Sequence, residues 1–315
     1  MEDIIIFRGG SKSQLFSIVL RRETLENDLR TVSRRSKSTW TLERLHSLEL
    51  FCRKGSNGLA WRNCWAQVLM LSFFVWGNVQ MLDFAVFVLG LIVGSFVNVC
   101  IHRLPRSESV VMPASHCPVC SGEIKPWHNI PLLGFLLLLG KCRTCRTPIS
   151  WRYPLVELLH GLGFLFILRQ FGPSTQTLVY LLFFSALVAV IFIDLSHQII
   201  PDVITLPGML IGVIAAATIL PPGLKGSVTG LLLGGGLFYL VAILSLALLK
   251  KEGMGGGDIK LIAMIGAFLG WQGVLLTIFL AALSGSIVGL FMILVKGRSR
   301  ADMIPFGPYL AFGAL

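Results

Sequence analysis

Apolar runs separated by short charged clusters occupy most of this chain after residue 80. A bilayer core about 30 Å thick is crossed by about 20 apolar helical residues. Runs near that length lie at Phe84–Ile101, Leu155–Leu168, Thr177–Ile193, Val203–Leu220, Val228–Leu249, Ile259–Trp271 and Val274–Val295, with a further start at Ile304. Of 315 residues, 54% are hydrophobic and only 14% are charged. We therefore expect an all-α polytopic membrane protein of about seven to eight transmembrane helices.

The net charge of +11 would by itself favour a nucleic-acid-binding protein. That function needs basic residues gathered on a wet surface, whereas these lie between apolar runs, so we expect no nucleic-acid partner. Cytoplasmic loops of membrane proteins are enriched in Lys and Arg. If Phe84–Ile101 runs from outside to inside, the outside segments after residue 81 keep only Arg169 and Lys225. The inside segments then hold Arg103, Arg106, Lys125, Lys141, Arg143, Arg146, Arg152, Lys250, Lys251, Lys260, Lys296, Arg298 and Arg300.

The chain divides by composition into four parts. Residues 1–80 are mostly polar and predict a disordered or loosely helical extension of doubtful function. Residues 81–101 form the first predicted membrane helix, residues 102–154 a hydrophilic cytoplasmic loop, and residues 155–315 the remaining helical core. The core ends within an apolar run, which predicts a helix truncated at the C-terminus.

The cytoplasmic loop carries two CxxC pairs, Cys117–Cys120 and Cys142–Cys145. Such pairs form tight knuckles that together supply four thiolates to a tetrahedral zinc ion, and Gly122 suits the turn of the first knuckle. Disulfides rarely persist in the cytoplasm. We expect a structural zinc site, because four sulfur ligands leave no open position for catalysis. Redox chemistry and metal-free thiols remain alternatives.

Two carboxylates lie where the membrane makes them costly. Asp194 ends one apolar run and Asp258 begins another, and the predicted topology places both at the cytoplasmic boundary. Two adjacent carboxylates share one proton, so one can activate a water while the other polarises a carbonyl group. The pair is therefore a candidate aspartic peptidase dyad.

Other residues are candidates for substrate binding or for support of this dyad. Gly255 and Gly257 precede Asp258 and permit close backbone approach, and Lys260 follows it. Asp202 is interpreted either as a helix cap or as a substrate or dyad contact. Two further residues, Glu157 and His160, share one helical face and are expected to pair with each other or with the cysteine loop.

In its motifs and their order, the sequence resembles the type IV prepilin peptidase family, also called the prepilin leader peptidase/N-methyltransferase family. The matching segments are Gly94–Val99 with Arg103–Pro105, the two CxxC pairs, Asn129–Pro131, Arg152–Glu157, Asp194 with Ile200–Asp202, Gly255–Asp258 and Pro305–Pro308. The resemblance covers nearly all of residues 81–315.

The resemblance implies a multi-pass enzyme of the bacterial inner membrane, with its active site facing the cytoplasm. It would remove a short basic leader from prepilins or pseudopilins, with Asp194 and Asp258 as the catalytic pair. The cysteine loop makes the chain look like a bifunctional member that also methylates the new N-terminal amine with S-adenosylmethionine, whose site is not placed. The expected partners are these precursors and membrane lipid.

Two other functions stay open on the sequence. An intramembrane protease of the presenilin and signal-peptide-peptidase kind also uses a Gly-x-Gly-Asp carboxylate, although it would place its dyad deeper and lacks a tetracysteine loop. An ion- or proton-coupled transporter could use Asp194 and Asp258 to carry cations, but the repeated halves typical of many transporters are not evident.

Overall fold

The computed structural model describes residues 59–112, 114–250, 254–296 and 305–315. We expected residues 1–80 to form a disordered or loosely helical extension, and most of these residues lie outside the described ones. By internal contacts the chain divides into one unit ending at Met81 and a second covering Leu82–Leu315. All sites discussed below belong to the second unit.

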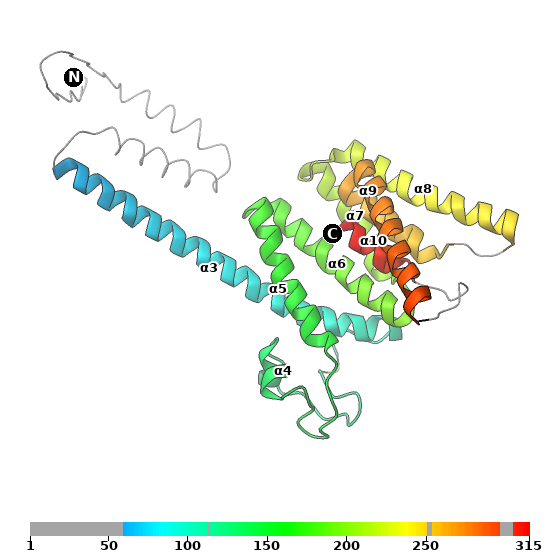
Figure 1. Cartoon of the computed structure of the whole chain (residues 1–315), viewed down its shortest axis with the longest axis horizontal. Helices are drawn as coiled ribbons and strands as arrows, with labels where there is room; N and C mark the ends of the chain where they lie inside the picture. The colour runs from blue at the N-terminus through cyan, green and yellow to red at the C-terminus, as the bar shows by residue number, and fades with distance from the viewer. Residues whose placement is uncertain (1–58, 113, 251–253, 297–304) are drawn as a thin grey trace, which may run out of the picture. The chain divides into compact units, whose positions relative to one another are not determined.

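The described part of the chain is all-α, as expected. Its longer helices are α3 (Leu59–Arg103), α5 (Arg152–Phe171), α6 (Thr175–His197), α7 (Asp202–Thr218), α8 (Gly223–Leu249) and α9 (Gly256–Lys296). A short helix, α10 (Gly307–Ala314), follows α9. Between α3 and α5 the chain forms the 3-10 turns η1 (Leu104–Arg106) and η2 (Pro126–His128) and the short helix α4 (Leu133–Leu137), which project from the long helices (Figure 1).

Among the residues that the structure describes, five helical segments are long and apolar enough to cross a membrane. They are Gln80–Arg106, Arg152–Phe171, Thr175–His197, Gly223–Leu248 and Gly256–Val295. The expected run Val203–Leu220 corresponds to α7. At 17 residues, α7 is shorter than each of these five segments. The expected runs Ile259–Trp271 and Val274–Val295 belong to one 41-residue helix, α9, which breaks at Gly270, where φ is 74°.

Large apolar side chains face outward along these helices. Leu178 and Leu182 on α6, Leu232 on α8 and Phe279 on α9 are each at least 60% exposed. Such extensive apolar surface has no place in water and fits contact with lipid. The described fold is therefore that of a multi-pass membrane protein.

Helix α6 lies between two apolar cores of the second unit. It contacts α5, α7 and α10 (Figure 1). Leu187 and Val190 belong to a core shared with α7, α9 and α10, whereas Val188 and Ile193 belong to a second core shared with α3 and α5. A helix that is apolar on all sides is expected in such a buried position. The packing on both sides fixes the end of α6, where Asp194 lies.

Glycines allow the closest helix approaches. A Cβ added at Gly230 of α8 would lie 2.5 Å from the carbonyl oxygen of Gly266 in α9, and one at Gly234 would lie 2.8 Å from that of Ile262. The Ser227 hydroxyl donates to the Ala267 carbonyl oxygen at 2.7 Å along the same contact. Small residues at four-residue spacing are typical of closely packed membrane helices. This contact holds the first part of α9, and therefore Asp258, against α8.

Gly230→Ala should destabilise the protein by about 1–3 kcal/mol, because the new methyl group would overlap the α9 backbone. The measurement is thermal unfolding of the purified protein in detergent. Gly236→Ala is the matched control on the same helix, since a Cβ there meets no atom within 4 Å. Equal unfolding temperatures for the two variants would contradict this account of the α8–α9 contact.

Candidate active site and candidate metal centre

The two CxxC pairs form similar knuckles in the projecting loop. In the first, the Cys117 N–H donates to the Gly122 carbonyl oxygen and the Ser121 N–H donates back to Cys117. In the second, Cys142 exchanges the equivalent bonds with Thr147 and Arg146. The backbone of each knuckle therefore turns both of its cysteines toward a common point.

The four sulfur atoms lie within 4.8 Å of one another, as the spacing predicted. The Cys117 and Cys145 Sγ atoms are 3.8 Å apart. A tetrahedron with Zn–S bonds of about 2.3 Å has edges of about 3.8 Å, so the cluster fits a zinc ion. A hydrogen bond from the Thr147 hydroxyl, 3.2 Å from the Cys145 sulfur, helps lower the pKa of Cys145 to about 6. Because metal binds the thiolate form, this lowered pKa favours metal binding by Cys145.

Gly122 lies in the turn of the first knuckle, where its carbonyl oxygen accepts from the Cys117 N–H, but it is not the left-handed residue of that turn. The left-handed residues are Ser121, with φ of 54°, and Arg146, with φ of 60°, at equivalent positions of the two knuckles. Gly122 instead provides space, because a Cβ there would lie 3.2 Å from the Thr144 hydroxyl oxygen of the other knuckle. The glycine thus allows the two CxxC turns to pack together.

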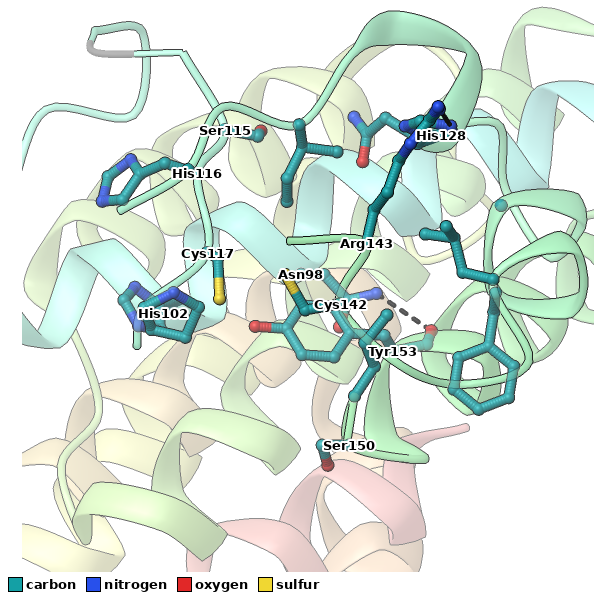
Figure 2. Close-up of a pocket in the computed structure, with 18 of the residues that line it drawn as sticks. Asn98, His102, Ser115, His116, Cys117, His128, Cys142, Arg143, Ser150 and Tyr153 are labelled. Atoms are coloured by element: carbon teal, nitrogen blue, oxygen red, sulfur yellow. Dashed lines mark hydrogen bonds between the residues drawn. The ribbon is translucent and has the colours of Figure 1, made fainter. Parts of the chain in front are cut away.

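A cavity of about 790 Å³ lies where the knuckles meet the ends of α3 and α5. Figure 2 shows Asn98 of α3 beside Tyr153 of α5 in this cavity, with Cys142 close by. At its edge the Glu157 carboxylate accepts hydrogen bonds from the Leu132 N–H, at 2.8 Å, and from Ser95. Of the two pairings expected for Glu157, the structure has the one with the cysteine loop. His160 instead bonds the Val156 carbonyl oxygen in its own helix.

The two predicted dyad carboxylates lie together. Asp194, only 5% exposed, is in the last turn of α6, and Asp258 is in the first turn of α9. They are close enough for the charge of Asp194 to act on Asp258. The backbone N–H groups of Gly307 and Gly255 hydrogen-bond Asp194 and Asp258, respectively.

Two glycines and one isoleucine make this proximity possible. A Cβ at Gly307 would lie 2.6 Å from Asp194 Oδ2 and 2.9 Å from the Ile200 side chain. A Cβ at Gly257 would also lie 2.9 Å from Ile200. The starts of α9 and α10 therefore both pack against Ile200 in the α6–α7 connection. No role was predicted for Gly307, although the segment Pro305–Pro308 drew attention to it.

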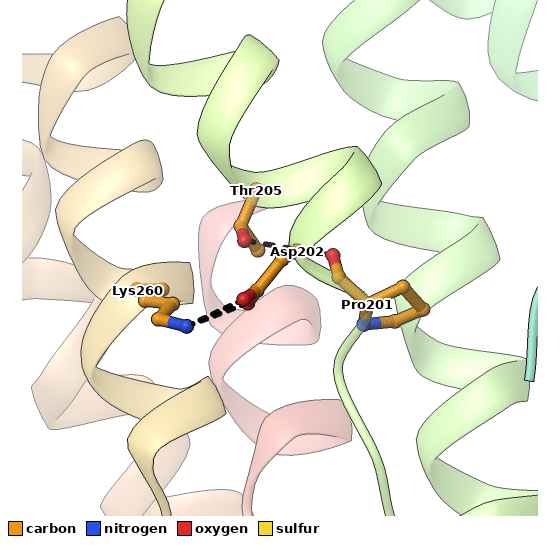
Figure 3. A network of polar contacts seen from close by, with 4 residues as sticks. All are labelled: Pro201, Asp202, Thr205 and Lys260. Carbon is orange, nitrogen blue, oxygen red and sulfur yellow. Dashed lines mark hydrogen bonds and ion pairs between the residues drawn. The ribbon is translucent and has the colours of Figure 1, made fainter.

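Asp202 and Lys260 form an ion pair that links α7 to α9 (Figure 3). The Lys260 ammonium group donates to both carboxylate oxygens of Asp202 at 2.7 Å. The helix-cap interpretation of Asp202 is therefore wrong: Pro201 occupies the cap position, and no side chain caps this helix. The pair is half-exposed, and it joins the turns that begin α7 and α9.

Two family models match parts of this chain. Residues 88–171 match the bacterial peptidase A24 N-terminal domain, and residues 181–290 match the type IV leader peptidase family. The chain is 41% identical to a prepilin leader peptidase/N-methyltransferase of Pseudomonas aeruginosa over 71% of its own length and 85% of the relative. It is 44% identical to one of Myxococcus xanthus over 68% of this chain and 64% of the relative.

A third relative with the same description, from Aeromonas hydrophila, is 39% identical over 72% of this chain and 86% of its own length. No solved structure matches the chain. The two matched regions contain both CxxC pairs and both dyad carboxylates. The chain belongs to the prepilin leader peptidase/N-methyltransferase family.

Proposed function

We propose that this protein is a membrane-embedded aspartic endopeptidase that removes the basic leader from type IV prepilins or pseudopilins. It would then methylate the exposed N-terminal amine with S-adenosylmethionine. The observation that carries the peptidase assignment is the meeting of Asp194 and Asp258 at the ends of two otherwise apolar helices.

The chemistry follows from two carboxylates that share one proton. The ionised carboxylate takes a proton from water, which attacks the scissile carbonyl carbon while the protonated carboxylate donates to its oxygen. The carboxyl group that took the proton from water then gives it to the leaving amine as the C–N bond breaks, and the other carboxylate takes back the proton from the hydroxyl group as the carbonyl re-forms. The N–H groups of Gly307 and Gly255 orient the two carboxylates for this exchange.

The position of the dyad suits a substrate that is itself a membrane helix with a basic cytoplasmic leader. The excess of Lys and Arg in the loops on the same side as the dyad supports a position at the cytoplasmic face of the bacterial inner membrane. In this arrangement α7, the two parts of α9 on either side of Gly270, and α10 supplement the remaining long helices, giving about seven to eight membrane segments.

The cysteine cluster would hold a structural zinc ion through Cys117, Cys120, Cys142 and Cys145. Bound zinc would lock the two knuckles together, since the loop has few apolar contacts of its own. Four thiolates leave no position for water, so the ion would support the fold of the loop.

Asp194→Asn and Asp258→Asn should each reduce leader cleavage by about a thousandfold or more, because an amide cannot take up the proton. The measurement is the cleavage rate of a purified prepilin in detergent, read on a gel. Asp83→Asn is the matched control, since Asp83 pairs with Arg169 at the other end of the helices. Near-normal cleavage by either dyad variant would disprove the assignment.

The Asp202–Lys260 pair would orient the entrance to the dyad without taking part in proton transfer. Asp202→Asn and Lys260→Gln should each raise the KM for prepilin up to about fivefold and change kcat little, since half-exposed ion pairs contribute about 1 kcal/mol or less. Steady-state kinetics with both single variants and the double variant would test the coupling. A loss of kcat comparable to that of Asp194→Asn would instead assign Asp202 to the reaction.

Metal analysis of the purified protein should find about one zinc ion per chain. The double change Cys117→Ser and Cys120→Ser should remove the metal and increase proteolysis of the cysteine loop. Cys100→Ser, which alters a cysteine of α3 outside the cluster, should keep the zinc. Wild-type protein that is fully active and contains no zinc would refute a structural role for the metal.

A further inference from the structure

The short helix α4 of the projecting loop carries an apolar face that is exposed within the described part of the chain. Three of its leucines are spaced three and four positions apart, so they share one side of the helix. A fourth leucine follows the helix, and the four side chains are between 54% and 86% exposed. These are the α4 leucines: Leu133, Leu136, Leu137 and Leu139.

The opposite side of α4 packs against the protein. Gly134, Phe135 and Leu138 line the cavity beside the knuckles. The Phe135 ring also lies 4.9 Å from the ring of Trp151, the residue before α5. These contacts fix the rotation of α4 about its own axis. The exposure of the α4 leucines is therefore a consequence of how the helix is held.

Leu139 stands where neither the backbone nor the packing of the loop favours a leucine. Its φ is 50°, in the left-handed region that disfavours residues with a Cβ. At 86%, it is also the most exposed large apolar side chain among the described residues. An apolar partner outside the chain would account for a leucine at this position.

Contacts with α5 place α4 at the level where a membrane span begins. The Leu132 N–H, just before α4, donates to the Glu157 carboxylate at 2.8 Å. Glu157 lies five residues after Arg152, the first residue of both α5 and its candidate membrane span. Five residues advance a helix by about 7.5 Å. Helix α4 therefore lies beside the first turns of this span, where lipid headgroups meet acyl chains.

The charge of this part of the loop suits an anionic membrane surface. Residues 124–151 contain four Lys or Arg residues and no Asp or Glu. Lys125, Lys141 and Arg143 are all exposed. The Lys125 ammonium group lies 5.3 Å from the centre of the Trp127 ring. Basic residues are attracted to anionic headgroups, and tryptophan is enriched at the same boundary.

We propose that α4 is a membrane anchor that lies in the plane of the bilayer. The α4 leucines insert among the acyl chains of the leaflet at which α3 ends and α5 begins, and Lys125, Lys141 and Arg143 bind its anionic headgroups. This surface continues the lipid-facing surface of α5, on which Leu155 and Leu162 are exposed. Apolar insertion and headgroup attraction together are what hold amphipathic segments in the interface.

Anchoring would give the cysteine loop a fixed position beside the membrane. The loop projects from the long helices, and a free loop of this length could move relative to them. Bound lipid on the outer side of α4 would press its inner side against the start of α5. The proposal concerns the loop alone and does not depend on the proposed catalytic activity.

The test uses the purified full-length protein in vesicles of three parts phosphatidylcholine to one part phosphatidylglycerol. Either Leu137 or Leu139 is replaced by the photoreactive residue p-benzoylphenylalanine, which joins to a nearby C–H group under ultraviolet light. Mass spectrometry then identifies the adduct. Both positions should give lipid adducts. The same replacement at Glu123, an exposed polar residue of the loop, is the control and should give about fivefold fewer.

The headgroup contribution is measured in the same vesicles. Adducts with phosphatidylglycerol should be enriched about twofold or more over its share of the lipid. The combined changes Lys125→Gln, Lys141→Gln and Arg143→Gln should return the adducts to the vesicle composition. Lys225→Gln, at an exposed lysine of α8, is the control and should keep the enrichment. An absence of enrichment in the protein with its basic residues intact would overturn headgroup binding.

The nature of the adduct decides between lipid and other partners. Adducts within the chain or with a second copy would overturn the anchor and assign this face to protein contacts. Added prepilin should leave the lipid adducts unchanged, and prepilin adducts in their place would assign the face to the substrate. A lack of lipid adducts at both positions, in variants that elute from gel filtration like the wild-type protein, would also overturn the proposal. Each of these results would leave the peptidase assignment standing.

Discussion

Asp194 is a carboxylate at the end of a helix that is apolar on every side, and much of the structure serves to keep it there. In lipid a polar group must find its partners within the protein. The partners of Asp194 come from other helices: a backbone N–H at the start of α10 and a second carboxylate at the start of α9. Because α6 packs against one core on each side, its end cannot tilt toward the membrane without disrupting both.

Close packing in this protein depends on the absence of side chains at a few positions. Gly307 lets α10 begin against Asp194, Gly257 lets α9 begin against Ile200, and Gly230 lets α8 approach the α9 backbone. In a membrane, an apolar side chain gains little by contacting another helix instead of lipid. The steric fit between helices therefore has a larger part in setting their positions. The dyad is thus set by helix spacing as much as by its own hydrogen bonds.

The sequence predicted those features that depend on local chemistry. Asp194 and Asp258 were identified because charged residues are scarce in the apolar segments. The four clustered cysteines were identified from the spacing of each CxxC pair, which is visible within a short segment. Several features that depend on distant contacts were not predicted. The partner of Asp202 is Lys260, 58 positions away, and the space that Gly122 provides is filled by the second knuckle. The need for a glycine at position 307 likewise could not be predicted without knowing that α10 packs against the end of α6.

Asn98 illustrates the same limit. In the sequence it is one polar residue in an apolar run, and a helical membrane segment tolerates such a residue when it bonds a neighbouring helix. The structure provides that bond to Tyr153 but uses only half of the amide. A purely structural asparagine would be expected to satisfy both ends, since the unused oxygen is costly in a buried site. The sequence could not show this cost, because it depends on how α3 packs against α5, whose Tyr153 lies 55 positions away from Asn98.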